Sequence, residues 1–514
     1  MGFVRMVTEL ISSPEMRALE TNAEYYGISL LQLMENAGRN IAEEIVSRFT
    51  PKKTKVAIFC GLGGNGGDGF VAARYLTCLG FKVEIILASK AVNIASEPAK
   101  KNWIALQPLT SIIPIREVRD STQIPDVKAD VVVDALLGIG LTGKLRPPIL
   151  QLVEKINSMN VFCVAMDVPT GINSDSGQVL GNAVNADLTV TFYKSKSGLA
   201  KAKDYAGEIV VKDIGLPQEF ERFVGPGDVM LAVKPRLAEA HKGMFGRLLV
   251  IGGSNVFSGS PALAALAGLR TGIDIATIAA PEQTANAISS MSPALITIKL
   301  KGKHLNSNNL STLTEQLQSA TAVVLGPGLG LHNETREAIK EIIEQVEKTK
   351  TPLLLDADGV KAFAEFKRKL DCPLVLTPHV REYEILTGTT LPIALVEKSQ
   401  AVQKMARKLG ATILLKGAVD IISNGECTKF NFTGNPGMTV GGTGDVLSGI
   451  IGGLLAMGAN SFVAAVAGAF INGSAGDFVA VEKGYHMLPT DLLDWIPHVM
   501  DDPMCHKEVR TNQF

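Results

Sequence analysis

The chain has 514 residues, in which 50 lysines and arginines nearly balance 51 aspartates and glutamates. This length exceeds what one ordinary hydrophobic core supports, so we expect two large domains. The near-zero net charge and the lack of a long basic run exclude a surface built for nucleic acid, so the ligand has to be sought through local chemistry.

The six cysteines are scattered without a Cys-x-x-Cys pair, which indicates reduced thiols in a cytoplasmic protein rather than a disulfide framework or a zinc site. The first residues include acidic side chains and lack a sustained apolar stretch, so they resemble neither a signal peptide nor a transit peptide. An uncharged run at residues 446–471 is long enough to span a bilayer. Gly458, Asn460 and Ser461 divide this run, and we predict two buried helices joined by a tight turn.

The first half of the chain opens with a helical pattern over residues 13–49 and then repeats a unit of apolar run, glycine-rich turn and helical stretch. The apolar runs cover residues 55–60, 82–87, 130–135, 161–167 and 188–192. This alternation predicts an α/β domain with a mainly parallel, Rossmann-like sheet between layers of helices. The segment 215–228 is rich in Pro and Gly, so we predict a linker there and assign residues 1–220 to the first domain.

The alternation restarts after the linker and predicts a second three-layer α/β domain over residues 228–514. Its apolar runs cover residues 247–252, 275–279, 322–325, 353–356, 374–376 and 413–415, with helical patterns at 333–348 and 398–409. The end of the chain, residues 501–514, is polar, and we expect it to be loose.

Two glycine-rich loops follow strands of the first domain. The loop GLGGNGGDG, residues 61–69, contains the G-x-G-x-x-G spacing, but the next strand does not end in the acid that a dinucleotide fingerprint requires. The segment GIGLTGK, residues 138–144, has P-loop spacing, but Leu145 stands where Ser or Thr should hold magnesium. We therefore reject both standard motifs, although the second loop can still offer amides to a phosphate-bearing ligand.

Three carboxylates of the first domain, Asp68, Asp134 and Asp167, lie at or just beyond strand ends. Because the carboxyl ends of parallel strands meet in one crevice, we expect these three side chains to converge. Like charges held close together need a proton or a cation, and Asn65, Asp134 and Thr170 offer oxygen ligands that suit an alkali or alkaline-earth ion. The alternative is that these residues only form turns and helix caps.

Four segments, LLQLMENAGRNIA, GGNGGDGF, VVVDALLGIGLTG and AMDVPTGIN, resemble in order the signatures of the NAD(P)H-hydrate epimerase domain. The resemblance implies catalytic roles for Asp68 and Asp167 and a potassium ion held by Asn65, Asp134 and Thr170. The substrate contacts that it implies are Gly64, Asn65, Gly66, Gly67, Asp68, Gly138, Ile139, Gly140, Leu141, Thr142, Gly143, Lys144 and Asp167. Gly64 replaces an asparagine that is usual in the family, and Lys196 falls where the family tends to carry a lysine.

The strongest single motif of the chain is GGTGDVLSGIIGGLLAMG, residues 441–458. Its small residues expose amides at a helix N-terminus, and Asp445 follows at once. Such amides can hold an anion, and an adjacent carboxylate can take a proton from a hydroxyl that attacks phosphorus. His379 alone would suggest a packed or capping histidine, but between Pro378 and Glu382 at a strand end we expect it to line the site.

Three segments, HKGMFGRLLVIGGS, TPHVREYE and NPGMTVGGTGDVLSGI, resemble the ribokinase superfamily and more closely its NAD(P)H-hydrate dehydratase branch. The resemblance implies that Gly328, His379 and catalytic Asp445 face the hydrate. It implies that ADP or ATP, with magnesium, is bound by Lys416, Gly417, Ala418, Val419, Asp420, Asn435, Pro436, Gly437, Met438, Thr439, Val440, Gly441, Gly442, Thr443 and Gly444.

We therefore expect a bifunctional enzyme, in which the first domain epimerises NAD(P)H hydrate and the second dehydrates the S form at the expense of the nucleotide. We also expect a homo-oligomer. One alternative is a ribokinase-family kinase of a small vitamin precursor with an accessory N-terminal binding domain. Another is a non-catalytic scaffold, although a scaffold has no need of an acidic cluster. Vitamin kinases more often carry Asn where this chain has His379, which favours the dehydratase.

Overall fold

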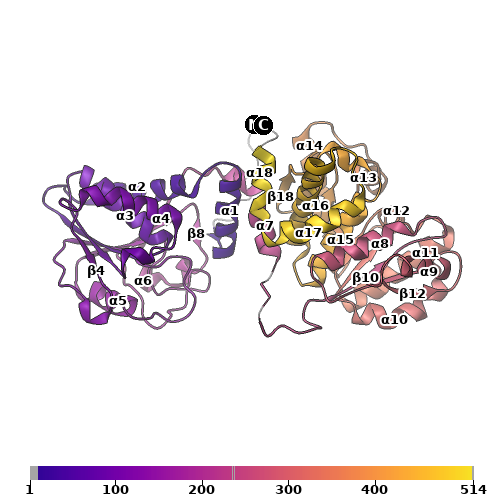
Figure 1. Cartoon of the computed structure of the whole chain (residues 1–514), viewed down its shortest axis with the longest axis horizontal. Coiled ribbons are helices and arrows are strands. Elements are labelled where there is room, and N and C mark those ends of the chain that lie inside the picture. Colours follow the sequence, from indigo (N-terminus) through magenta and orange to yellow (C-terminus); the bar gives the residue numbers. More distant parts are fainter. Residues whose placement is uncertain (1–9, 234, 237, 512–514) are drawn as a thin grey trace. The chain divides into compact units, whose positions relative to one another are not determined.

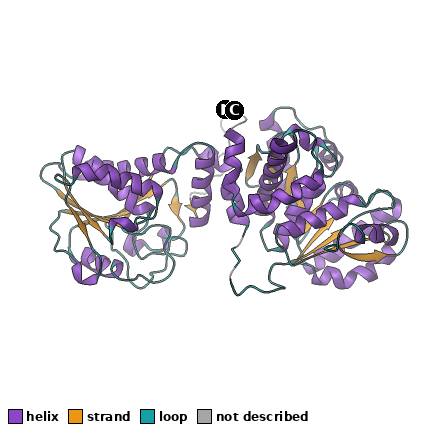
Figure 2. Ribbon diagram, viewed as in Figure 1, coloured by secondary structure: helices purple, strands orange, loops and turns teal. Residues whose placement is uncertain are grey.

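The computed structural model describes residues 10–233, 235–236 and 238–511. The chain divides into two compact units, Met1–Phe220 and Glu221–Phe514, and each is a sheet covered by helices (Figure 2). The segment in which we predicted a linker contains a 3-10 helix, Gln218–Arg222, and the start of α7 (Pro226–Ala232).

The first unit is built on a seven-stranded sheet whose neighbours are all parallel, in the order β4-β3-β2-β5-β6-β7-β9. The strands are β2 (Lys55–Cys60), β3 (Lys82–Leu87), β4 (Ile115–Glu117), β5 (Val131–Ala135), β6 (Phe162–Met166), β7 (Leu188–Phe192) and β9 (Glu208–Lys212). The predicted apolar runs are all strands, and the two strands without a prediction, β4 and β9, lie at the edges. The strand order reverses between β2 and β5, which is where such sheets bind ligands.

Helices cover both faces of this sheet (Figure 1). They are α1 (Ser13–Tyr25), α2 (Leu30–Arg48), α3 (Gly64–Cys78), α4 (Glu97–Leu106), α5 (Ile149–Ser158) and the short α6 (Lys203–Ala206). The helical pattern predicted over residues 13–49 is two helices, because Gly27 takes a φ of 103° and Ser29 caps α2 with a capping box. A two-stranded parallel sheet of β1 (Leu10–Ile11) and β8 (Ser195–Lys196) brings α1 beside the segment that carries Lys196.

The second unit is built on a nine-stranded sheet in the order β12-β11-β10-β13-β14-β15-β16-β17-β18. The strands are β10 (Arg247–Ile251), β11 (Ile275–Pro281), β12 (Ile296–Leu300), β13 (Ala322–Leu325), β14 (Leu353–Leu355), β15 (Leu374–Leu376), β16 (Thr412–Leu415), β17 (Asp420–Ser423) and β18 (Thr428–Asn431). The pairs from β12 to β16 are parallel, and β17 and β18 add an antiparallel edge. The predicted α/β class is confirmed in both units.

The longest helices of the second unit include the two predicted from the uncharged run, α15 (Thr443–Ala456) and α16 (Ser461–Lys483). The remaining α-helices that follow α7 are α8 (Gly259–Arg270), α9 (Glu282–Ser289), α10 (Leu310–Ser319), α11 (Asn333–Thr349), α12 (Asp358–Phe366), α13 (Val380–Thr387), α14 (Leu395–Leu409), α17 (Leu492–Asp501) and α18 (His506–Thr511). Within the described residues, α16 is long and apolar enough to cross a membrane, but 83% of its apolar window is buried inside the protein. It is therefore a core helix, as predicted.

The expectation that the end of the chain is loose is wrong for the residues that the structure describes. A 3-10 turn, Pro503–Cys505, follows α17, and α18 continues to Thr511. His506 is only 2% exposed. The sequence hides this packing, because the buried residues Pro503, His506 and Val509 stand among polar ones and include only one aliphatic side chain. Residues 512–514 lie outside the described part of the chain.

Gly449→Ala tests the close approach of α15 to α8. A Cβ at Gly449 would lie 2.1 Å from the carbonyl oxygen of Ala264 and 2.8 Å from the Cβ of Ala267. Alanine favours a helix by about 1 kcal/mol over glycine, but overpacking costs about 1–3 kcal/mol or more. We expect thermal unfolding of the full chain to show a lowered Tm. Gly259→Ala on α8 is the control, since nothing lies within 4 Å of its added Cβ. Equal Tm values for the two variants would contradict the tight contact.

Candidate active sites

The first site begins at the loop between β2 and α3. A Cβ at Gly61 would lie 1.8 Å from the carbonyl oxygen of Leu136, and a Cβ at Gly66 would lie 2.0 Å from that of Gly61, so these glycines allow backbone segments to touch. Gly63 and Gly64 instead face open space. Gly63 caps α3 without a side-chain hydrogen bond, which leaves the first amides of the helix available to an anion.

Asp167 forms a buried ion pair with Lys196 at the end of β6. Its Oδ1 lies 2.5 Å from Lys196 Nζ and accepts a hydrogen bond from Thr191 Oγ1 at 3.0 Å. The ammonium also donates to the carbonyl oxygen of Phe192 at 2.9 Å, and Lys196 is 1% exposed. Asp167 itself has a φ of 64°, a strained conformation for a residue with a Cβ. The lysine that the sequence singled out without a firm role is therefore the partner of a predicted catalytic acid.

Two further carboxyl groups surround this pair. Burial raises the pKa of Asp68 well above its usual value, and the negative charges of Asp167 and Glu20 raise it further. Burial followed by the charge of Asp167 raises the pKa of Glu20 to about 7. Lys196 opposes both shifts but does not cancel them. Both carboxyl groups are therefore harder to ionise than free ones, and the pKa of Glu20 lies near neutral pH.

Sequence reasoning missed Glu20, which occupies what looks like the polar face of an amphipathic helix. The same face of α1 carries Arg17, whose Nη2 donates to the carbonyl oxygen of Ile139 at 3.2 Å. This contact ties α1 to the predicted substrate loop, residues 138–144, whose Thr142, Gly143 and Lys144 are exposed. Glu20 comes near Lys196 because β1 pairs with β8. These strands have two residues each, too few to be recognised in the sequence, so no sequence signal pointed to Glu20.

Asp134 is bonded differently from the other two predicted acids. Its Oδ2 accepts from the Thr170 backbone N–H and its Oδ1 from Thr170 Oγ1, each at 2.7 Å. Burial raises its pKa to about 6, while the hydrogen bonds from Thr170 and Leu136 limit the rise. The structure thus couples Asp68 with Asp167, whereas Asp134 is held by Thr170.

The residues proposed for the cation lie together near the start of the 138–144 loop. Thr170 Oγ1 lies 3.1 Å from the carbonyl oxygen of Leu137, and Asn65 Oδ1 would lie 3.2 Å from a Cβ at Gly138. Asn65 Nδ2 is buried without a hydrogen-bond partner within the described residues. The nitrogen and oxygen of a side-chain amide are assigned from their hydrogen bonds. Turning the Asn65 amide would therefore put its oxygen where the unbonded Nδ2 now lies. Neutral oxygens with one carboxylate fit an alkali cation.

The second site is built on Asp356, a buried carboxylate just after β14 to which the sequence analysis assigned no role. It accepts hydrogen bonds from Lys416 Nζ at 2.9 Å, Thr377 Oγ1 at 2.9 Å and Ser448 Oγ at 2.7 Å. Burial would raise its pKa, but the charge of Lys416 and the three hydrogen bonds hold the pKa below its usual value. The carboxylate therefore fixes the position of Lys416 against α15.

Asp445 lies in the first turn of α15, close to Lys416. A Cβ at the adjacent Gly444 would lie 3.4 Å from Lys416 Nζ, so the ammonium and the helix N-terminus face the same space. Burial followed by the charge of Asp356 raises the pKa of Asp445 to about 6, against the lowering effect of a Ser260 hydrogen bond and of Lys416. This carboxylate is ionised at neutral pH with a pKa close enough to accept a proton.

Gly328 borders the same place, because its added Cβ would lie 3.4 Å from the Cβ of Ser260. Ser260, on α8, was missed by sequence reasoning, since a serine at the start of a helix usually signals only a cap. Ser260 lies beside both Gly328 and Asp445, the two residues that we expect on the hydrate side of the site.

His379 caps α13, which was the simpler of the two interpretations of this residue. Its Nδ1 accepts from the Glu382 backbone N–H at 3.3 Å, and the Glu382 carboxylate accepts from the His379 backbone N–H at 3.1 Å. The imidazole is still 51% exposed, and the backbone of His379 pairs with that of Lys416. The cap therefore holds the ring at the edge of the site.

The two predicted nucleotide loops are stabilised by their own polar groups. Asp420 accepts from the Gly417 backbone N–H at 3.0 Å, which closes the turn between β16 and β17. Asn435 caps the 3-10 turn Pro436–Thr439, and Thr443 Oγ1 donates to the carbonyl oxygen of Met438 at 2.8 Å. Both loops lead to residues that surround the N-terminus of α15.

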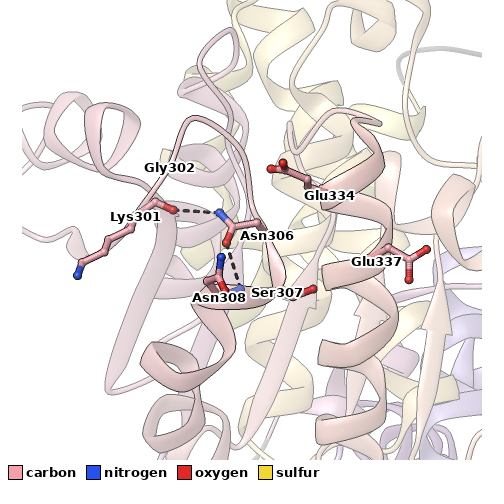
Figure 3. A pocket seen from close by; sticks show the side chains of 7 residues that line it. All are labelled: Lys301, Gly302, Asn306, Ser307, Asn308, Glu334 and Glu337. Atoms are coloured by element: carbon pink, nitrogen blue, oxygen red, sulfur yellow. Dashed lines mark hydrogen bonds between the residues drawn. The ribbon is translucent and has the colours of Figure 1, made fainter.

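A pocket of about 570 Å³ lies away from these residues, beside α11 (Figure 3). Its lining residues are Lys301, Gly302, Asn306, Ser307, Asn308, Glu334 and Glu337. Asn306 Nδ2 donates to the carbonyl oxygen of Lys301 at 3.0 Å, and the Asn308 backbone N–H donates to Asn306 Oδ1 at 3.1 Å. These polar groups close the loop on itself, and none of the predicted site residues lines the pocket.

Two protein families match the two halves of the chain. Residues 30–198 match the family described as YjeF-related protein N-terminus, and residues 248–498 match the NAD(P)H-hydrate dehydratase family. The bifunctional NAD(P)H-hydrate repair enzyme of Hyperthermus butylicus is 42% identical over 96% of this chain and 93% of its own length. That of Methanothermobacter thermautotrophicus is 43% identical over 97% of each chain.

The chain belongs to the family of bifunctional NAD(P)H-hydrate repair enzymes. It combines an NAD(P)H-hydrate epimerase with an NAD(P)H-hydrate dehydratase, as predicted. Among solved structures, a ribokinase-like superfamily protein from Enterococcus faecalis is 27% identical with a TM-score of 0.49, covering 55% of this chain and 95% of that one. An ADP/ATP-dependent NAD(P)H-hydrate dehydratase from Bacillus subtilis, co-crystallised with ATP and Mg²⁺, is 24% identical with a TM-score of 0.46, covering 54% and 98%.

Lys196→Met tests the buried ion pair of the epimerase unit. Removing one partner leaves Asp167 as a buried charge without a counter-charge, which costs about 3–5 kcal/mol. We expect urea unfolding followed by circular dichroism to show a lower midpoint for this variant. Lys201→Met, at an exposed position, serves as the control. The double variant Lys196→Met/Asp167→Asn removes both charges and should recover part of the loss. A midpoint like that of wild type for Lys196→Met alone would contradict the structural role of the pair.

Proposed function

We propose that Asp445 is the general base of the dehydratase and that the start of α15 holds the phosphoryl group in transit. The supporting observation is the meeting of three features: the helix N-terminus at residues 441–444, the ammonium of Lys416 and a carboxylate whose pKa is about 6. Amides and an ammonium stabilise the negative charge that spreads over a transferring phosphoryl group.

The reaction begins at the hydroxyl on C6 of the hydrated nicotinamide. Asp445 takes the hydroxyl proton as the oxygen attacks the terminal phosphorus of the nucleotide, and the bond from phosphorus to the shorter nucleotide breaks. The lone pair of the ring nitrogen then expels phosphate from C6. Loss of a proton from C5 restores the double bond of the reduced nicotinamide. Hydroxide is a poor leaving group and phosphate a good one, so the phosphoryl transfer is what makes elimination feasible.

The phosphoryl donor in this proposal is ADP or ATP, bound by residues 416–420 and 435–444. The described residues contain no group of three His, Cys, Asp or Glu side chains that could hold a metal ion. Magnesium bound with a nucleotide is coordinated mainly by phosphate oxygens and water, so it does not require such a cluster. When bound, the ion would neutralise charge on the phosphates, while Lys416 and the α15 amides orient them.

Asp445→Asn tests the base. We expect the rate of NADH recovery from S-hydrate and ADP to fall roughly 10²–10⁴-fold, measured by the near-ultraviolet absorbance of NADH, while epimer exchange in the same sample is unchanged. In the wild type, kcat/KM for dehydration should fall as the pH drops below about 6, because the carboxylate that accepts the proton becomes protonated there. Recovery at the wild-type rate by the variant would exclude Asp445 as the base.

In the epimerase we propose that Asp68 supplies the proton that the C6 hydroxyl needs. Protonated Asp68 protonates the leaving hydroxyl as the ring nitrogen forms a double bond to C6. Water then adds from the opposite face and releases a proton to solvent, and Asp68 takes up a proton again before the next turnover. Asp167, paired with Lys196, and the amides of residues 64–67 orient the substrate. The raised pKa of Asp68 supports its role as an acid at neutral pH.

We also propose that Asn65, Asp134 and Thr170 hold a potassium ion. A bound cation would supply a fixed positive charge beside the substrate loop. It would also neutralise the carboxylate of Asp134, which is completely buried and has no ionic partner within the described residues.

Exchange of potassium for tetramethylammonium tests this site. We expect slower epimerisation and a lower Tm without potassium, because a buried charge without a counter-ion is costly. Asp134→Ala should epimerise slowly in either salt and lose the Tm difference. Dehydration of pure S-hydrate at saturating nucleotide is the control and should not change. A wild-type enzyme whose epimerase rate and Tm ignore the cation would rule the site out.

A further inference from the structure

The end of the chain, beyond the segment that matches the dehydratase family, reaches into the second unit. That match ends at residue 498, whereas α18 begins at His506. The imidazole of His506 packs edge-on against two rings of α16, Phe470 and Phe478, with centroids 5.7 and 5.9 Å away. Figure 1 labels α16 and α18, the two helices that carry these rings. Because His506 is 2% exposed, this segment is part of the folded core.

His506 contacts a carboxylate of α16 that is equally buried. Its Nε2 lies 3.0 Å from Oδ2 of Asp477, which is 2% exposed. The same oxygen accepts from the Gly434 backbone N–H at 2.9 Å, and Oδ1 accepts from Asn435 Nδ2 at 2.9 Å. Asp477 therefore joins the C-terminal helix to the first residues of the second nucleotide loop.

Asn435 connects Asp477 to the rest of the loop by hydrogen bonds. Its Nδ2 also donates to the carbonyl oxygen of Gly476 at 3.0 Å, so α16 fixes the amide from two sides. Its Oδ1 accepts from the Gly437 backbone N–H at 3.0 Å and begins the 3-10 turn Pro436–Thr439. A Cβ at Gly476 would lie 2.2 Å from the sulfur of Met438, so the turn also rests on α16. The loop ends in the amides at the start of α15.

We propose that His506 is a positioning residue of the dehydratase, which acts through Asp477 and Asn435 to hold the 435–444 loop in the conformation that receives the nucleotide. This inference rests on the proposed role of that loop. A buried carboxylate needs hydrogen-bond donors, and hydrogen bonds to charged groups are among the strong ones. Two of the donors to Asp477, the Gly434 N–H and Asn435 Nδ2, belong to the loop itself. The third, His506 on α18, lies outside the loop and so holds the carboxylate in place whether or not the nucleotide is bound.

The test compares His506→Phe with His506→Gln in the full-length enzyme. Phenylalanine keeps the ring packing between Phe470 and Phe478 but removes the donor, while glutamine retains an amide N–H. We expect His506→Phe to raise the KM for ADP roughly tenfold or more with little change in kcat, and His506→Gln to restore most of the affinity. His498→Phe, at an exposed position of α17, is the matched control. Thermal unfolding of each sample reports on folding of the second unit, which contains all of these positions.

Asp477→Asn provides a second arm and should raise the KM for ADP as His506→Phe does. Unchanged KM values in His506→Phe and Asp477→Asn, or equal losses of kcat and Tm in both His506 variants without a KM effect, would overturn the positioning role. Calorimetric titration of the wild type with ADP separates this from the proposed function. If the wild type does not bind ADP, the proposed nucleotide role fails and the positioning role with it; normal wild-type binding with unaffected variants overturns the positioning role alone.

Discussion

Each unit of the protein depends on a buried carboxylate beyond the end of a parallel strand that is matched by one lysine from elsewhere in the chain. In the first unit Lys196 pairs with Asp167, and in the second Lys416 pairs with Asp356. A carboxylate left alone at such a depth would have to take up a proton or lose several kcal/mol of stability. Both backbones are strained beside the pair, with φ of 64° at Asp167 and 49° at Ala357. The strand ends are therefore fixed by electrostatics as much as by the sheet.

Each unit has one lysine at this place, and it pairs with one carboxylate only. The neighbouring acids have no ion-pair partner of their own among the described residues, and their pKa values are raised. Glu20 and Asp445 have pKa values raised to about 7 and about 6, and that of Asp68 is raised well above its usual value. In each case burial is the first cause and a neighbouring carboxylate the second. Groups that exchange protons near neutral pH are what acid–base catalysis needs. The same arrangement that stabilises Asp167 and Asp356 thus tunes the acids beside them.

The sequence revealed most of the fold because the parallel strands are buried on both faces and appear as short apolar runs. In the two large sheets it missed β4, β9, β12, β17 and β18, all at or next to sheet edges, where strands are less completely buried and carry more polar residues. Glycine loops and strand-end acids led to Asp68, Asp167 and Asp445, because these depend on local chain geometry. Glu20, Asp356 and Ser260 depend on contacts between distant segments, and their local sequences indicate an exposed helix face, a turn and a helix start. His506 was missed because a single buried polar residue leaves no periodic pattern.

The rigidity of the second site explains why an epimerase belongs in the same chain. Asp356 fixes Lys416, Ser448 joins α15 to Asp356, and Ser260 hydrogen-bonds to Asp445, so the proposed base and the amides proposed to bind the phosphoryl group are held in place by several contacts. Attack on phosphorus requires the substrate oxygen to lie in line with the bond that breaks, and effective rates fall steeply when a reacting group is misplaced. In the mechanism that we propose, only one configuration at C6 can present its hydroxyl to both Asp445 and the phosphoryl group. A flexible site could accept both epimers but would hold neither in line. The specificity that makes dehydration efficient therefore leaves the other epimer untouched, and the epimerase unit converts it.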